Sequence, residues 1–139
     1  MSTVTLATLL AYDCWSLLET AEIARVAWHD EDGIGLVPVN YTVADGGLWF
    51  RTEKSSGLAR HTDGHPVVVE VDQVDLATKA GWSVVVRGHA ELVDELDVPD
   101  MLVEMQVWPA GSHSVFVRVE AEQLTGRRLW GPLPTEGGS

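Results

Sequence analysis

The chain has 139 residues, of which 45% are hydrophobic, and its formal net charge is −12. This length and composition suit one globular domain with a buried core and exclude a disordered chain. The negative charge argues against nucleic acid and anionic membranes as partners, since both are bound through clustered lysine and arginine. No apolar run is long enough to cross a membrane, and residues 1–20 carry no basic leader before an apolar stretch. We therefore expect one cytoplasmic domain over residues 1–139, with residues 131–139 as a loose tail.

The first half of the chain predicts a short helix followed by strands. Residues 9–20 place leucines and Cys14 on one face at helical spacing. A single cysteine excludes an internal disulfide and agrees with a reducing compartment, and we interpret Cys14 as a buried residue of this helix. Alternating side chains then predict strands over residues 23–28, 34–44 and 48–52. The turns between these strands contain glycine, which tolerates positive φ.

The second half predicts three more strands and two short helices. The strands cover residues 66–74, 82–93 and 115–126, and the helices cover residues 58–61 and 99–104. The run Val67-Val68-Val69 predicts burial on both faces of its strand. About six short strands with two or three small helices indicate a mainly β fold, a barrel with helical caps.

Four segments recur beside these strands in a fixed order: Pro38-Val39-Asn40-Tyr41, Phe50-Arg51-Thr52, Gly81-Trp82-Ser83 and Thr125-Gly126-Arg127-Arg128-Leu129. Together they resemble the flavin-binding split-barrel family related to pyridoxamine 5'-phosphate oxidase, in its small single-domain form. The resemblance implies a six-stranded split β-barrel of the type that binds flavin mononucleotide (FMN). It also implies a homodimer with cofactor clefts between the subunits.

The resemblance further implies which residues contact the cofactor. Arg51, Thr52 and the loop serines Ser55 and Ser56 would hold the flavin phosphate, because a cation, hydroxyl groups and a helix start all favour an anion. The contacts implied elsewhere in the cleft are Val39, Asn40, Tyr41, Trp82, Ser83 and, from across the dimer, Trp108. Alternative interpretations are a surface ion pair for Arg51, core packing for Tyr41 and Trp82, a strand cap for Ser83, and a plain interface anchor for Trp108.

One position departs from the family pattern. Relatives commonly carry a lysine just before the second helix, where this chain has Gly57, and Lys54 lies earlier in the loop. Loss of a cation weakens phosphate binding unless another group replaces it. The chain would then bind FMN weakly, recruit Lys54 or another arginine, or bind a different ligand in the same cleft, such as a deazaflavin coenzyme or haem.

No side chain stands out as a general acid or base, which suits a reaction carried by a flavin. A metal site at His61 and His65 is disfavoured, because Asp63-Gly64 interrupts the helix that would align them. The first hypothesis is therefore an FMN-dependent oxidoreductase acting on a small-molecule substrate. The alternatives are the same fold with deazaflavin or haem, and a non-catalytic binding protein with weak or lost FMN affinity.

Overall fold

The predicted strands and the first two predicted helices are present in the computed structural model, which describes residues 5–94 and 114–130. The elements are β1 (Thr5–Thr8), α1 (Ala11–Leu18), β2 (Ile23–Asp30), β3 (Gly33–Ala44), β4 (Gly47–Glu53), α2 (Gly57–Thr62), β5 (Pro66–Val74), β6 (Gly81–Val93) and β7 (Ser114–Trp130). Two features were not predicted: strand β1, and the extension of β7 beyond Gly126 to Trp130. The helix predicted over residues 99–104 lies outside the described residues.

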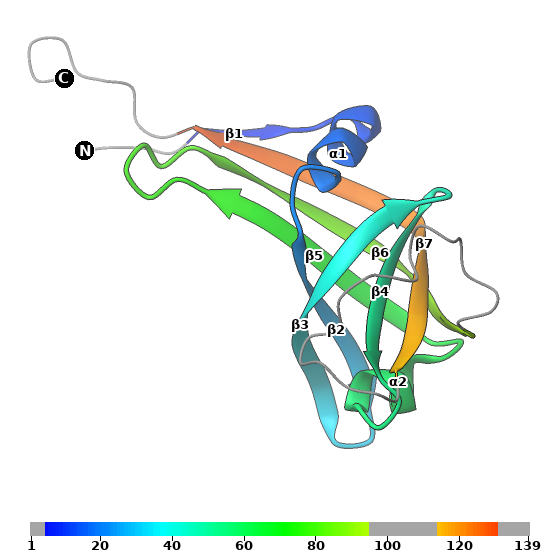
Figure 1. Cartoon of the computed structure of the whole chain (residues 1–139). Helices are drawn as coiled ribbons and strands as arrows, with labels where there is room; N and C mark the ends of the chain where they lie inside the picture. The colour runs from blue at the N-terminus through cyan, green and yellow to red at the C-terminus, as the bar shows by residue number, and fades with distance from the viewer. Residues whose placement is uncertain (1–4, 95–113, 131–139) are drawn as a thin grey trace, which may run out of the picture.

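Antiparallel pairing closes six of these strands into a ring. The order in the sheet is β1-β7-β4-β3-β2-β5-β6, and β6 pairs in addition with β7. Strands β2 to β7 therefore form the predicted six-stranded barrel, and β1 is a short addition beside β7. Figure 1 shows α1 near one end of the barrel and α2 near the other. Ring closure leaves few unpaired strand edges, which protects a β protein from edge-to-edge association.

A β-bulge bends the long pair β6–β7. Arg87 lies opposite Gln123 and Gly88 lies opposite Ala121, so Glu122 is an extra residue on β7. A Cβ atom at Gly88 would lie 2.0 Å from the carbonyl oxygen of Glu120, so only glycine allows this close approach. Because a bulge increases local twist, β7 can pair with β4 along its first half and with β1 along its last residues.

The core fills the barrel with alternate side chains of β2, β5 and β6. On β4 the consecutive residues Leu48, Trp49 and Phe50 are all buried, and Trp49 packs with Phe116 of β7 in a second, smaller cluster. Val67 and Val69 of β5 are buried, with exposed fractions of 2% and 0%. Val68 between them is only half-buried and faces outward, so the prediction of burial on both faces of β5 was wrong. In a closed barrel one face of each strand meets the core and the other faces out, which a run of valines does not reveal.

Both described helices are fixed by specific contacts. Cys14 and Leu18 of α1 are fully buried against the barrel, and the hydroxyl of Tyr41 on β3 donates a hydrogen bond to the carbonyl oxygen of Leu18. At α2, the hydroxyl oxygen of Ser56 caps the helix by accepting a hydrogen bond from the backbone N–H of Ala59 at 3.1 Å. Neither of these helices is long and apolar enough to span a membrane.

Candidate functional site

Three of the predicted cofactor residues meet in one pocket at the α2 end of the barrel. This pocket, here called the hydroxyl pocket, has a volume of about 280 Å³. Its lining consists of Val37, Pro38, Val39, Thr52, Ser56, Gly57 and Leu58. The walls are mostly apolar, and the polar groups come from Thr52 and Ser56. Such a combination is typical of a small-molecule site, in which a few polar groups orient a ligand against an apolar surface.

The local fold holds the two hydroxyl groups of this pocket together. Thr52 lies near the end of β4 and is 8% exposed, and its hydroxyl is hydrogen-bonded to that of Ser56 at 3.0 Å. The backbone N–H of Ser56 donates to the carbonyl oxygen of Glu53 at 3.1 Å, which closes the turn between β4 and α2. Ser55, in the same turn, is exposed and does not line the pocket.

Arg51 lies on the other face of β4 from Thr52, because neighbouring side chains alternate along a strand. Its Nε atom donates a hydrogen bond to the hydroxyl oxygen of Ser114 at 2.7 Å. Its guanidinium group lies 5.1 Å from the centre of the Phe116 ring, within range of a cation–π contact. The structure therefore does not bring Arg51 together with Thr52 and Ser56, and its phosphate-binding role stays a prediction.

The predicted ring contacts are divided between the two faces of the sheet. Val39, Tyr41 and Trp82 point into the barrel and are 4%, 5% and 6% exposed. Burial raises the pKa of Tyr41 to about 12. Asn40 and Ser83 are half-buried on strand positions that alternate with these core residues. Core packing thus accounts for Tyr41 and Trp82, and Trp108 lies outside the described residues.

Ser83 lines a different pocket, which the sequence did not indicate. This second pocket has a volume of about 550 Å³ and is here called the arginine pocket. Side chains from three strands line it: Thr8, Ser83, Val85, Arg87, Thr125 and Arg127. Its lining contains two cationic groups and no carboxylate.

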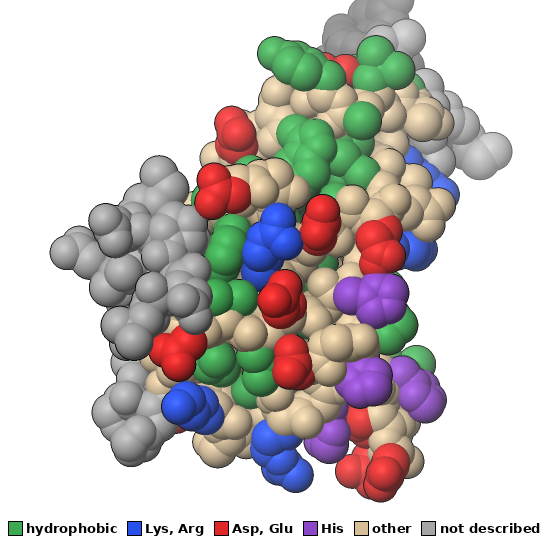
Figure 2. All heavy atoms as spheres, turned by 90° about the vertical axis from the view of Figure 1, so that its right-hand side faces the viewer, with side chains coloured by type: hydrophobic (Ala, Val, Ile, Leu, Met, Phe, Trp, Pro, Cys, Tyr) green, Lys and Arg blue, Asp and Glu red, His purple; other side chains and the backbone are tan. Residues whose placement is uncertain are grey.

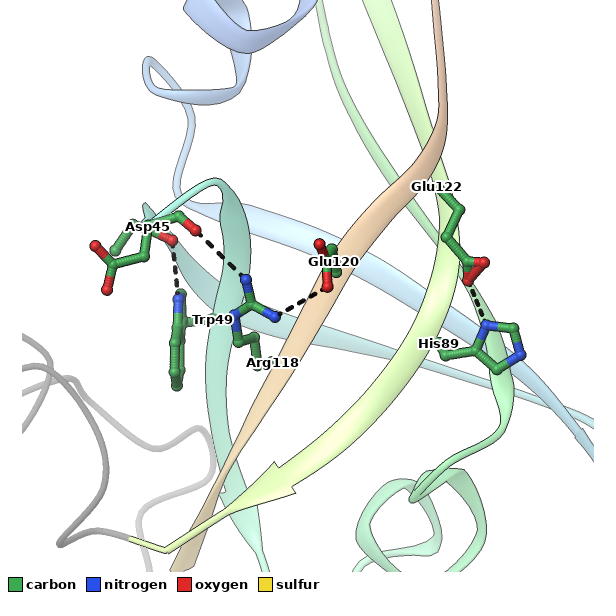
Figure 3. Close-up of polar contacts among 7 residues, drawn as sticks. Asp45, Trp49, His89, Arg118, Glu120 and Glu122 are labelled. Carbon is green, nitrogen blue, oxygen red and sulfur yellow. Dashed lines mark hydrogen bonds and ion pairs between the residues drawn. The ribbon is translucent and has the colours of Figure 1, made fainter.

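A third pocket is acidic, and its basic groups, His89 and Arg118, are already paired. Its charged lining residues are Asp63, His89, Glu91, Arg118, Glu120 and Glu122. Figure 3 shows Arg118 donating to the backbone oxygen of Asp45 and to the carboxylate of Glu120, both at 3.4 Å. His89 faces Glu122 in the same view. No group of three or more metal-binding side chains is arranged as a metal site within residues 5–94 and 114–130.

Carboxylates outnumber basic groups in this chain, with 21 acidic and 9 basic residues. Figure 2 shows acidic side chains scattered over one face of the molecule, with few and separate lysine and arginine side chains. Arg25 bridges two carboxylates, those of Glu70 and Asp72, at 3.0 Å each. Burial is the main cause that raises the pKa of Glu70 to about 7, and the neighbouring Asp72 raises it further.

A closed barrel of six antiparallel strands with a hydroxyl-lined pocket at one end places the protein in the class of split-barrel proteins. The profile of the pyridoxamine 5'-phosphate oxidase family matches residues 11–128, and the chain belongs to this family. This confirms the resemblance on which the fold prediction was based.

Relatives of known structure agree with this assignment. The chain is 30% identical to a FAD-binding protein from Mycobacterium smegmatis, with a TM-score of 0.69 over 89% of this chain and 98% of the other. It is 26% identical to a putative pyridoxamine 5'-phosphate oxidase from Corynebacterium glutamicum, with a TM-score of 0.72 over 90% and 94% of the two chains. An uncharacterised protein of Mycobacterium tuberculosis is 32% identical over 122 residues, which cover 81% of this chain and 78% of the relative.

Proposed function

We propose that the protein is a flavin-dependent oxidoreductase that holds FMN and reduces or oxidises a small-molecule substrate. The observation that carries the proposal is the hydroxyl pocket, in which the hydroxyl groups of Thr52 and Ser56 lie 3.0 Å apart. The family resemblance implies that both residues hold the flavin phosphate. The FAD-binding relative at 30% identity supports a flavin as the cofactor. FMN is the flavin that the family resemblance implies, and we adopt it in this proposal.

The residues of the hydroxyl pocket fit the phosphate end of a flavin in part. Thr52 and Ser56 supply hydroxyl donors, and Val37 and Pro38 supply apolar wall. The volume of about 280 Å³ lies at the lower end of ligand sites, so the flavin ring must extend beyond this pocket. The lining of the hydroxyl pocket contains no cationic side chain. Gly57 occupies the position where the family resemblance implies a lysine, and Lys54 is exposed and does not line the pocket. A bound flavin supplies the hydride chemistry, while the protein binds it, orients it and excludes water.

A homodimer completes this proposal, because the exposed apolar side chains of β2 and β3 need a partner surface. Ile23, Ile34 and Leu36 are 41%, 79% and 63% exposed. The β2–β3 register and the alternation along each strand put all three on the outer face of the barrel. Arg25 and His29 share this outer face, so it mixes polar groups with exposed apolar side chains, a composition found at protein–protein interfaces. The second subunit would cover the part of the flavin that the hydroxyl pocket cannot.

The absorption spectrum of the purified protein after incubation with FMN and desalting tests the proposal. Retained flavin bands at about one per subunit are expected, with smaller retention of riboflavin, which lacks the phosphate. A protein that holds neither FMN nor FAD would contradict the flavin assignment. Reoxidation of the chemically reduced bound flavin by a nitro-aromatic acceptor then tests the reductase activity.

Two variants separate the predicted phosphate ligands. Thr52→Val keeps the side-chain shape and removes the hydroxyl group, so it should weaken FMN binding by about tenfold and leave riboflavin binding nearly unchanged. Arg51→Ala tests whether the arginine reaches the phosphate from the other face of β4. Equal effects of Arg51→Ala on FMN and riboflavin would remove Arg51 from the phosphate site.

A further inference from the structure

The outer face of the barrel carries an acidic group between the two polar residues predicted to contact the flavin ring. Asn40 of β3 lies opposite Ile23 of β2, and Ser83 of β6 lies opposite Asp72 of β5. Side chains directly opposite each other in an antiparallel pair point to the same side of the sheet. Strands β2 and β5 lie between β3 and β6 in the sheet. At about 4.8 Å between neighbouring strands, Asn40 and Ser83 are separated by roughly 14 Å across the sheet, a distance that the fused rings of a flavin can bridge.

Arg25 joins two carboxylates on this face. It lies opposite Glu70 in the pairing of β2 with β5, and Asp72 follows Glu70 by two residues on the same side of β5. A single nitrogen of Arg25, Nη1, donates to Oε1 of Glu70 and to Oδ2 of Asp72, both at 3.0 Å. One cation shared by two carboxylates leaves a negative charge in excess when both are ionised. A proton on one of the carboxylates removes that excess.

The surroundings of Glu70 favour a proton on its carboxylate at neutral pH. Burial first, and then the hydrogen bond and charge of Asp72, raise the pKa of Glu70 to about 7 against the opposing effect of Arg25. From β6, the residue directly opposite Glu70 is the uncharged Val85, and the nearest charged side chain on that face is Arg87, two residues along. The side chain of Glu70 is still 32% exposed, so a ligand lying on this face can reach it.

We propose that Glu70 donates a proton to the substrate of a flavin bound on this face, with Arg25 and Asp72 as positioning residues. The inference rests on the proposed function, because a reduced flavin must supply the hydride. A substrate that accepts hydride gains an electron pair and one proton, and a second proton is needed to neutralise it. Glu70 gives this proton and becomes a carboxylate, which the guanidinium group of Arg25 stabilises. Solvent then returns a proton to Glu70.

Reduction of a nitro group to a nitroso group needs such a donor, since it takes two electrons and two protons. One nitro oxygen accepts hydride from the reduced flavin, which forms an O–H bond and brings the electron pair with the first proton. Glu70 gives the second proton to the same oxygen, the N–O bond breaks, and water leaves. The products are the nitroso compound, water, the oxidised flavin and the Glu70 carboxylate.

Anaerobic reoxidation of the chemically reduced, FMN-loaded protein by two acceptors tests the proposal. Reduction of 4-nitroacetophenone requires a proton, whereas ferricyanide takes single electrons and requires none. Glu70→Gln should slow reoxidation by the nitro compound about 100-fold and leave FMN retention and the ferricyanide rate unchanged. In the parent protein the nitro rate should fall as pH rises through about 7, because Glu70 loses its proton. Glu91→Gln removes an exposed carboxylate elsewhere on β6 and should leave both rates unchanged.

Carbon-13 NMR of the carboxyl groups in flavin-free protein gives a measurement that does not depend on turnover. The signal that is missing from the Glu70→Gln spectrum assigns Glu70, and its titration midpoint should lie at about pH 7. Asp72→Asn removes the neighbouring negative charge and should lower this midpoint. The pH at which the nitro rate falls should decrease by the same amount, a link that a merely structural role of Glu70 would not produce.

Two results would overturn the proposal and leave the proposed function standing. One is an unchanged nitro rate, or equal slowing with both acceptors, in a Glu70→Gln protein that retains FMN. The other is a Glu70 carboxyl group that titrates near its ordinary value of 4.5. Failure of the parent protein to retain any flavin would instead contradict the proposed function, and the donor role of Glu70 with it. Absorption of the desalted protein before reduction distinguishes these cases.

Discussion

At position 57 the structure leaves room for the lysine that the family resemblance led us to expect there. A Cβ atom added to Gly57 would have one neighbour, the Cζ2 atom of Trp28 at 3.4 Å, which is an ordinary van der Waals distance. We expect Gly57→Lys to fold normally and to bind FMN about tenfold more tightly, because a charge-assisted hydrogen bond to phosphate contributes roughly 1.5 to 3 kcal/mol.

Riboflavin is the control ligand for this variant, since it has no phosphate for the new ammonium group to contact. Fluorescence quenching of each flavin on titration gives both dissociation constants. An equal gain for riboflavin, or no gain for FMN, would show that position 57 does not face the phosphate.

A second glycine, Gly35 on β3, permits close packing of the Trp28 indole. A Cβ atom at position 35 would lie 2.2 Å from Cε2 and Cζ2 of Trp28. The ring cannot move away easily, because Trp28 is 7% exposed and its Nε1–H donates to Asp30 at 2.9 Å. We expect Gly35→Ala to lower the free energy of unfolding by about 1 to 3 kcal/mol.

Urea unfolding measures this loss. Gly57→Ala is the matched control, because its new methyl group would lie 3.4 Å from the same indole, an ordinary contact distance. Position 57 also lies in a helix, α2. It should leave stability unchanged or slightly raised, since alanine is a better helix former than glycine. A Gly35→Ala protein as stable as its parent would mean that Trp28 repacks without strain.

At the level of the elements, the sequence was sufficient to predict the six barrel strands. Alternation in β3 and β6 and the glycine turns between strands are local signals, and they were confirmed. Strand β1 was not predicted, because four residues carry little local pattern and depend on pairing with the distant end of β7. The face of Val68 was predicted wrongly for a similar reason, since burial on the outer side depends on neighbours and not on the residue itself.

The candidate site was predictable only where its residues are close in sequence. Thr52 and Ser56 are four residues apart, and their meeting follows from one turn and one helix cap. The motif pairs Arg51 with Thr52, but strand alternation places them on opposite faces of β4. The arginine pocket depends on the register of three strands, so spacing along the chain gave no sign that Arg87 and Arg127 would line one pocket.

Helix α1 depends on one hydrogen bond from β3 for part of its attachment. Replacing Tyr41 by phenylalanine removes the donor to the Leu18 carbonyl oxygen and leaves that buried group unpaired. We expect Tyr41→Phe to lower the free energy of unfolding by about 1 to 2 kcal/mol. Tyr12, the other tyrosine, is 80% exposed on α1, so Tyr12→Phe is the control and should leave the unfolding free energy unchanged.

Ultraviolet titration of the native protein gives an independent check on Tyr41. Burial raises its pKa to about 12, so the Tyr41 phenol should stay protonated at a pH at which tyrosine ordinarily ionises. The Tyr41→Phe protein should therefore show the same native titration as its parent up to about pH 11. A smaller absorbance change in the variant within that range would contradict the buried position of Tyr41.

For the whole molecule, two carboxylates make stability depend on pH in opposite directions. The backbone N–H of Asp32 and the indole N–H of Trp28 donate hydrogen bonds to the Asp30 carboxylate and lower its pKa. The contribution of Asp30 to stability is therefore present above pH 3.8, its ordinary pKa, and is lost as the pH falls below that value. Glu70 has the reverse sign, because burial raises its pKa from 4.5 to about 7. The contribution of Glu70 to the free energy of unfolding is complete below pH 4.5 and is lost as the pH rises through about 7.

Removing the charge of Glu70 should therefore stabilise the protein in weakly alkaline solution. Glu70→Gln keeps an acceptor for Arg25 and cannot ionise, so the loss of stability between about pH 5.5 and pH 8 should be smaller than in the parent protein. Urea unfolding at the two pH values measures this difference. Glu91→Gln is the control, because it removes an exposed carboxylate from β6 and changes the net charge by the same amount. In a chain with a net charge of −12, the loss of any carboxylate relieves some charge repulsion, and this control measures that effect. Equal pH dependence in the Glu70→Gln and Glu91→Gln proteins would show that repulsion over the whole molecule, and not the burial of Glu70, governs stability in this range.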